Sequence, residues 1–256
     1  MQAKAGYKKQ AIPWPKHIIF IPLKRFVHIC SFVILAALGL QACRSHSNHG
    51  KKIFRYNETT GIASLDPAFA RNQSVMWAIH QLYNTLVEVN EQMQVQPSLA
   101  KSWEFSPDKR SIVFQLRTDV FFHNDPAFPT GKGRRLTARD VEYSFSRILN
   151  KATASPGAWI FNDRVDSLNP FAALNDSSFQ LNLVRPFQPI LGILSMQYCS
   201  IVPRKKKEKY KTDFRRHPVG SGPFAFVAWD EGQALIMKKN ENYFEADSSG
   251  KKLPYL

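Results

Sequence analysis

The fold is organised around one stiff turn, His217-Pro218-Val219-Gly220-Ser221-Gly222-Pro223-Phe224. Pro218 and Pro223 each fix φ and remove an amide donor, whereas Gly220 and Gly222 permit a close approach to a neighbouring backbone. A loop that enters a central strand is a common place for binding residues. The stretch therefore predicts either a binding loop or a purely structural turn.

The strand that follows this turn is predicted from its composition. Residues 224–229 (FAFVAW) are apolar on both faces, so we expect a covered, interior strand. Asp230-Glu231-Gly232 then predicts a reversal into a second strand over 235–239. The two strands should form a hairpin.

Upstream of the turn, helices and strands are predicted by spacing. Ser74 stands where an N-cap belongs, before apolar residues at helical intervals. Thr137-Ala138-Arg139-Asp140 has the spacing of a capping box and predicts a second helix. A Pro-Asp turn at 107–108 predicts a hairpin. Two further strands are predicted, one from alternating apolar residues over 179–183 and one over 197–202.

The positive charge is concentrated in two places. The formal net charge is +15 over 256 residues, and residues 1–52 hold nine Lys and Arg without any acidic residue. Residues 204–216 form a second basic cluster, which we interpret as a solvated, partly helical loop or as a docking patch for an acidic surface. Because no nucleic-acid recognition module accompanies this charge, nucleic acid is not an expected partner.

The start of the chain has the layout of a secretory signal. Lys24 and Arg25 precede the apolar run 31–40, which is followed by Leu40-Gln41-Ala42-Cys43. This tetrapeptide resembles a bacterial lipobox, so we expect a signal peptide over 1–43, lipidation of Cys43 and a tether over 44–52. The alternative is an uncleaved anchor in which Cys43 is an ordinary thiol. Without Cys30 and Cys43, only Cys199 remains, and no intrachain disulfide is expected.

Signatures of catalysis and of cofactor binding are missing from the sequence. It contains no Gly-rich phosphate loop with Lys-Ser or Lys-Thr, no HExxH, no GxSxG and no cysteine pairs at zinc spacing. His80, His123 and His217 have no partner that spacing assigns. We therefore expect no enzyme, no metal and no cofactor.

Seven segments, in order along the chain, resemble the family 5 extracytoplasmic solute-binding proteins of ABC importers, the oligopeptide-, dipeptide- and nickel-binding group. They are Ser64-Leu65-Asp66-Pro67, Leu82-Tyr83-Asn84-Thr85-Leu86-Val87, residues 97–104 (PSLAKSWE), Phe114-Gln115-Leu116-Arg117, residues 136–141 (LTARDV), residues 217–224, and Asn240-Glu241-Asn242-Tyr243-Phe244. Together they extend over almost all of residues 53–256.

The resemblance implies an α/β, periplasmic-binding-protein-like fold of type II, with two lobes and a small inserted domain. We assign residues 53–88 and 177–256 to a discontinuous first lobe and residues 89–176 to the insert. Because family members are roughly twice as long, the resemblance implies that the first lobe and the insert are present and that the second lobe is missing.

The function implied by the resemblance is capture of peptides between two lobes by hinge closure and delivery to an ABC permease. The protein would be periplasmic or at the cell surface and anchored to the membrane by lipid. Nickel chelates and oligosaccharides are alternative ligands. A surface lipoprotein acting as sensor, chaperone or adhesin, and an inactive truncated product, are alternative functions. The ligand-binding candidates are Asn72, Ser74, Trp159, Gln197, Tyr198, Ser221 and Gly222.

Overall fold

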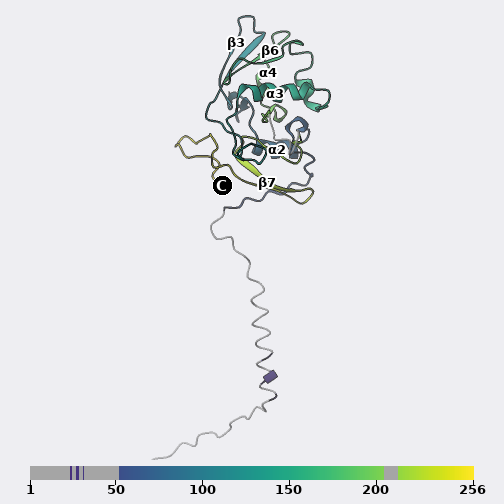
Figure 1. Ribbon diagram of the computed structural model, residues 1–256, viewed down its shortest axis with the longest axis vertical. Coiled ribbons are helices and arrows are strands. Elements are labelled where there is room, and N and C mark those ends of the chain that lie inside the picture. The colour runs from purple at the N-terminus through teal and green to yellow at the C-terminus, as the bar shows by residue number, and fades with distance from the viewer. Residues whose placement is uncertain (1–23, 25–26, 29–30, 32–51, 205–212) are drawn as a thin grey trace, which may run out of the picture. The chain divides into compact units, whose positions relative to one another are not determined.

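The computed structural model describes residues 24, 27–28, 31, 52–204 and 213–256 (Figure 1). The chain divides into two compact units, residues 1–52 and 53–256, and the fold below is that of the second. The expected signal peptide over 1–43, the lipidated Cys43 and most of the basic cluster over 204–216 lie outside the described residues. Within the described part of the chain, no helix is both long and apolar enough to cross a membrane.

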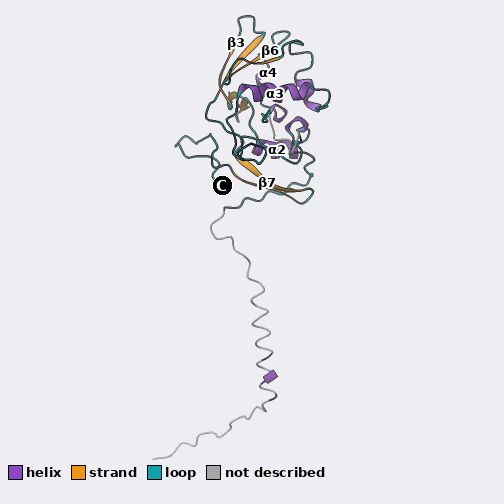
Figure 2. Ribbon diagram, in the orientation of Figure 1, coloured by secondary structure: helices purple, strands orange, loops and turns teal. Residues whose placement is uncertain are grey.

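Short helices and strands alternate along residues 53–256, and Figure 2 shows β3 and β6 at one end, β7 at the other, and α3 and α2 between them. In chain order the elements are η1 (Pro67–Phe69), α2 (Gln73–Leu82), β1 (Val87–Val89), β2 (Val95–Pro97), β3 (Ala100–Phe105), β4 (Ser111–Leu116), α3 (Ala138–Leu149), η2 (Pro156–Ile160), β5 (Phe171–Ala173), β6 (Ser178–Asn182), α4 (Ile190–Ile193), η3 (Gln197–Cys199), β7 (Phe224–Asp230) and β8 (Ala234–Lys239), where η marks a 3-10 helix.

Both predicted amphipathic helices are confirmed, but one N-cap differs. The capping box of α3 is present, with the Thr137 amide donating to Asp140 Oδ2 at 3.0 Å. The N-cap of α2 is Asn72, whose Oδ1 accepts from the Val75 amide at 3.0 Å. The prediction of Ser74 as the cap was therefore wrong, because Ser74 is already inside the first helical turn.

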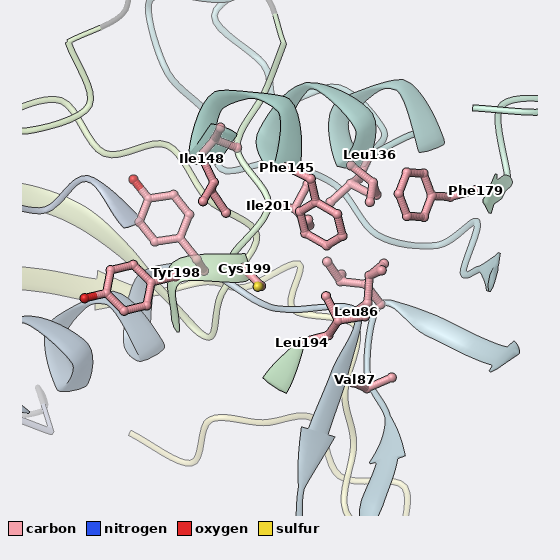
Figure 3. Packing of buried hydrophobic residues seen from close by; sticks show 14 of the residues in the cluster. Leu86, Val87, Leu136, Phe145, Ile148, Phe179, Leu194, Tyr198, Cys199 and Ile201 are labelled. Carbon is pink, nitrogen blue, oxygen red and sulfur yellow. The ribbon is translucent and has the colours of Figure 1, made fainter. Parts of the chain in front are cut away.

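The largest sheet is antiparallel, with strand order β3-β4-β6-β5, and α3 packs against β5 and β6. The hairpin predicted around residues 107–108 is confirmed as β3 and β4, and the strand predicted near 179–183 is β6. The aromatic core lies between α3 and this sheet. The Phe145 ring is perpendicular to the Phe179 ring at 5.5 Å, and both are fully buried (Figure 3).

The predicted boundary after residue 176 cuts through this sheet. It falls between β5 and β6, which are hydrogen-bonded neighbours with Phe171 opposite Leu181. Because β6 also pairs with β4, this sheet continues across the predicted boundary to Asn182. The division into a first lobe and an inserted domain stays a prediction.

The expectation of a covered strand over 224–229 was wrong. β7 and β8 do form the predicted hairpin, but among the described strands each pairs only with the other. The side chains of Val227 and Ile236 are 49% and 52% exposed. An apolar composition on both faces indicates an interior strand only when neighbouring elements cover both faces. Here Phe226, Trp229, Leu235 and Met237 pack against the core and β7 contacts α2, while Val227 and Ile236 remain exposed.

The turn over 217–224 makes the close backbone approach that its glycines predict. The Gly222 amide donates to the Leu82 carbonyl, at the end of α2, at 3.0 Å. A Cβ at Gly220 would lie 1.9 Å from that carbonyl oxygen, and a Cβ at Gly222 would lie 2.5 Å from the Leu82 carbonyl carbon. Because both obstacles are backbone atoms, only glycine fits at either position.

His123 holds the other side of this turn. Its amide donates to the Gly220 carbonyl at 2.7 Å, and its Nε2 is 2.8 Å from the Gly222 carbonyl oxygen. Since a carbonyl only accepts, Nε2 carries the proton. Burial lowers the pKa of His123 to about 4, with a smaller contribution from Lys238, while the Gly222 carbonyl acts in the opposite direction. The imidazole is therefore neutral in the folded protein at pH 7.

This buried imidazole predicts that the protein loses stability as the pH falls. The unfolded chain binds a proton at His123 below about pH 6.5, whereas the folded chain resists it until about pH 4. Full stability at this site is thus present above pH 6.5, and a loss on the order of 3 kcal/mol accumulates down to pH 4. Urea unfolding of wild type and His123→Gln across this range should show a flatter profile for the variant. Parallel profiles would contradict the assignment.

Candidate functional site

Three 3-10 helices and α2 converge on one surface. η1 contacts both η2 and η3, and α2 contacts η3. A hydrogen bond of 2.6 Å from Ser155 Oγ to the Ala68 carbonyl ties η2 to η1. This arrangement, called here the η surface, is formed by η1, η2, η3 and α2. It brings together the segments that carry Asn72, Ser74, Trp159, Gln197 and Tyr198.

Tyr198 is the fixed element of the η surface. A Cβ at Gly157 would lie 2.5 Å from Tyr198 Cδ1 and 2.7 Å from its Cγ, so the ring lies directly against the glycine backbone of η2. The residue is only 7% exposed. Burial raises the pKa of Tyr198, and the positive charge of Arg71 partly opposes this. The phenol is therefore neutral and is held in one position.

Gln197 lies beside Tyr198 but not in a strand. The strand predicted over 197–202 was wrong, because residues 197–199 form the 3-10 helix η3. Ser200 explains the difference, since its Oγ donates back to the Gln197 carbonyl at 2.8 Å and closes a turn. The Gln197 side chain points to α2, where its Nε2 is 3.1 Å from His80 Nδ1.

The remaining candidates on the η surface differ in exposure. The Asn72 side chain is exposed but occupied by capping α2. Ser74 is 5% exposed. Trp159 is 44% exposed, and the Arg164 guanidinium lies 5.8 Å from its ring centroid and also donates to its carbonyl. Trp159 thus offers an apolar face supported by a cation.

Ser221 and Gly222 lie at the other end of α2. Gln197 reaches this same end, because its side chain contacts His80 in the last turn of α2. Asn72 and Ser74 lie at the opposite end of the ten-residue helix, about 15 Å away.

Ser221 is 1% exposed, and its Oγ donates to Asn84 Oδ1 at 3.0 Å. The Asn84 side chain in turn donates to the Tyr243 hydroxyl at 3.1 Å. The Ser221 hydroxyl is therefore used in a hydrogen bond inside the protein. This burial does not agree with the expectation that Ser221 and Gly222 face a cleft.

Two features of the η surface escaped the sequence analysis. Arg71 is exposed and immediately precedes the cap of α2. Its place beside a predicted helix start is the sequence signal that could have marked it as a candidate. The pairing of Gly157 with Tyr198 joins residues 41 positions apart and has no local signal. Among residues 52–204 and 213–256, no group of three or more His, Cys, Asp and Glu side chains is placed to hold a metal ion.

The contact between Gly157 and Tyr198 predicts a coupled pair of substitutions. Gly157→Ala should lower the free energy of unfolding by about 1–3 kcal/mol, because the new methyl group overlaps the ring. The cost should shrink when Tyr198→Ala removes that ring. Gly192→Ala is the control, since nothing lies within 4 Å of its added Cβ. Urea unfolding of the four variants measures the coupling, and equal costs in both backgrounds would refute it.

Comparison with known proteins places this fold. Residues 94–256 match the family described as bacterial extracellular solute-binding proteins, family 5 middle. Heme-binding protein A of Haemophilus influenzae is 33% identical over 180 residues, covering 64% of this chain and 32% of the relative. The dipeptide-binding protein of Escherichia coli is 30% identical over 179 residues, again covering 64% of this chain and 32% of the relative.

A solved structure agrees with the sequence relatives. The ABC transporter-associated periplasmic binding protein DppA of Helicobacter pylori, in complex with the peptide STSA, matches with a TM-score of 0.61 and 32% identity over 72% of this chain and 38% of its own. The expected type II periplasmic-binding-protein-like α/β fold is therefore confirmed. The chain spans about a third of the length of the curated relatives it matches. It belongs to the family 5 bacterial extracellular solute-binding proteins.

Proposed function

We propose that this chain takes part in capturing peptides for an ABC importer and that its η surface is one face of the binding site. The curated relatives are solute-binding proteins rather than enzymes, and two of the proteins compared above are described as binding a dipeptide or a peptide. The observation that carries the proposal is the convergence of η1, η2, η3 and α2, with the fixed ring of Tyr198 between η2 and η3.

The η surface offers the contacts that an extended peptide needs. Gln197 and Ser74 supply polar groups, and Trp159 supplies an exposed ring on which a side chain can pack. Tyr198 and Asn72 border the same surface. Main-chain hydrogen bonds would provide affinity, and pockets for alternate side chains would provide selectivity. We assign Ser221 and Gly222 instead to holding α2 in place.

The cellular setting belongs to the same proposal. Closure of a second lobe over the η surface would enclose the peptide, and an ABC permease would receive it. Relatives are named as periplasmic proteins, which supports a periplasmic location. A lipid on Cys43 would keep the protein at the membrane, as expected from the lipobox-like sequence.

Heme is a second ligand class to test, because one relative is named a heme-binding protein. Nickel chelates and oligosaccharides, which the sequence resemblance also allows, can be tested in parallel. A peptide is the first ligand class to test because two of the proteins compared above are described as binding a dipeptide or a peptide.

Calorimetric titration of the 256-residue chain with a library of di- to tetrapeptides tests the proposal. Binding heat is expected with peptides and should fall at least about tenfold in affinity for Trp159→Ala, since a packed aromatic ring contributes on the order of 1–3 kcal/mol. Phe105→Ala, which removes a similarly exposed ring from β3, is the control. If only hemin gives binding heat, the proposal names the wrong ligand class. If no ligand gives binding heat, the proposed binding role is refuted.

A further inference from the structure

The exposed ring of Trp159 is accompanied by a fixed cation, the guanidinium of Arg164. The central carbon of this group lies 5.8 Å from the centroid of the Trp159 ring and 5.2 Å from the centroid of the Phe187 ring. The guanidinium also donates a hydrogen bond to the Trp159 carbonyl. Because Phe187 packs against the hydrophobic core, one arginine joins an exposed ring to a ring that the core holds in place.

Hydrogen bonds hold the backbone on both sides of Arg164. Its amide donates to the Phe161 carbonyl at 3.1 Å, and its carbonyl accepts from the Val184 amide at 2.8 Å. The next residue, Val165, forms a β-bridge with Leu183, and both side chains are buried. The position of the guanidinium beside the indole therefore follows from the packing of this segment and requires no ligand.

The charge of Arg164 is not neutralised by an ion pair. Within residues 52–204 and 213–256, no ion pair includes Arg164. The carboxylate of the adjacent Asp163 is exposed and is not paired with it either. The Trp159 side chain is 44% exposed. A ligand side chain that packs on this ring therefore meets an indole that already has a positive charge beside it.

A cation beside an indole changes which ligand side chains the ring attracts. An unaccompanied Trp ring attracts lysine and arginine side chains, because the face of the ring is negative. A ligand cation within about 6 Å of the ring centroid would lie within about 12 Å of the Arg164 guanidinium. Two positive charges at this separation repel each other at low ionic strength, where the Debye length is about 30 Å. The repulsion opposes the attraction to the ring, whereas an uncharged side chain keeps its packing.

We propose that Arg164 sets the side-chain selectivity of the Trp159 ring, so that this part of the η surface accepts uncharged side chains of a peptide and rejects lysine and arginine. The inference rests on the proposed peptide-binding function and adds the class of peptide that the surface selects. Arg164 acts on the ligand through its charge and through the ring beside which it is held.

Matched tripeptides separate the effect of charge from that of shape. Each contains two alanines and either arginine or citrulline, which is a neutral analogue of arginine with nearly the same shape. The variable residue is placed at the first, second or third position, so that the set covers each position that can meet the ring. Every peptide is titrated calorimetrically into the full 256-residue chain at an ionic strength of about 10 mM.

At one position or more, the wild-type protein should bind the citrulline peptide at least about threefold more tightly than the arginine peptide. Arg164→Gln should abolish or reverse this preference, because the ring is then free to attract a cation. Arg164→Lys keeps the charge and should retain most of the preference. Arg139→Gln, which removes an exposed arginine from the first turn of α3, is the control and should leave the preference unchanged.

The salt dependence of the wild-type protein is a second measurement that needs no variant. In about 1 M NaCl the Debye length is about 3 Å, so the preference for citrulline should disappear. This result decides the question if Arg164→Gln does not fold.

Equal binding of the arginine and citrulline peptides at all three positions would overturn the role of Arg164 while leaving peptide binding intact. Tighter binding of the arginine peptides, or a preference for citrulline that persists in Arg164→Gln and in high salt, would overturn it as well. If no peptide gives binding heat, the proposed function fails and the inference fails with it.

Discussion

The contact between the turn over 217–224 and the end of α2 is the constraint on which the rest of the structure depends. The Gly222 amide donates to the Leu82 carbonyl at 3.0 Å. A Cβ at position 220 or 222 would overlap the Leu82 backbone and prevent this close approach. His123 holds the two glycine carbonyls from the opposite side. Segments separated by about a hundred residues are thereby joined at one point.

This contact matters for the proposed binding surface because it fixes the position of α2, which extends to that surface. One end of the helix lies on the turn, and the other end, about 15 Å away, forms part of the η surface. A buried ion pair holds the segment before α2 as well, since Asp66 accepts two hydrogen bonds from Arg147 of α3. The position of Asn72 and Ser74 thus follows from internal contacts of the protein, as is usual where a rigid scaffold supports a binding surface.

Structural features that depend on residues close together in the sequence could be predicted. Features that depend on packing between distant segments could not. The capping box at 137–140, the β3–β4 hairpin and the glycine approach of the turn each follow from neighbouring residues. The 3-10 helix at Gln197 depends on a hydroxyl contact within a turn, and the exposure of β7 depends on which elements cover it. On the η surface, five candidates were chosen from the family resemblance, but the pairing of Tyr198 with Gly157 became visible only in three dimensions.

Hydrogen exchange of the α2 amides in Gly222→Ala tests most directly whether the turn holds this helix. Gly61→Ala is the reference, because nothing lies within 4 Å of its added Cβ. If the contact positions α2, its amides should exchange at least about tenfold faster in Gly222→Ala than in the reference, since local opening would cost roughly 1.4 kcal/mol less. Equal exchange rates in the two variants would contradict the account.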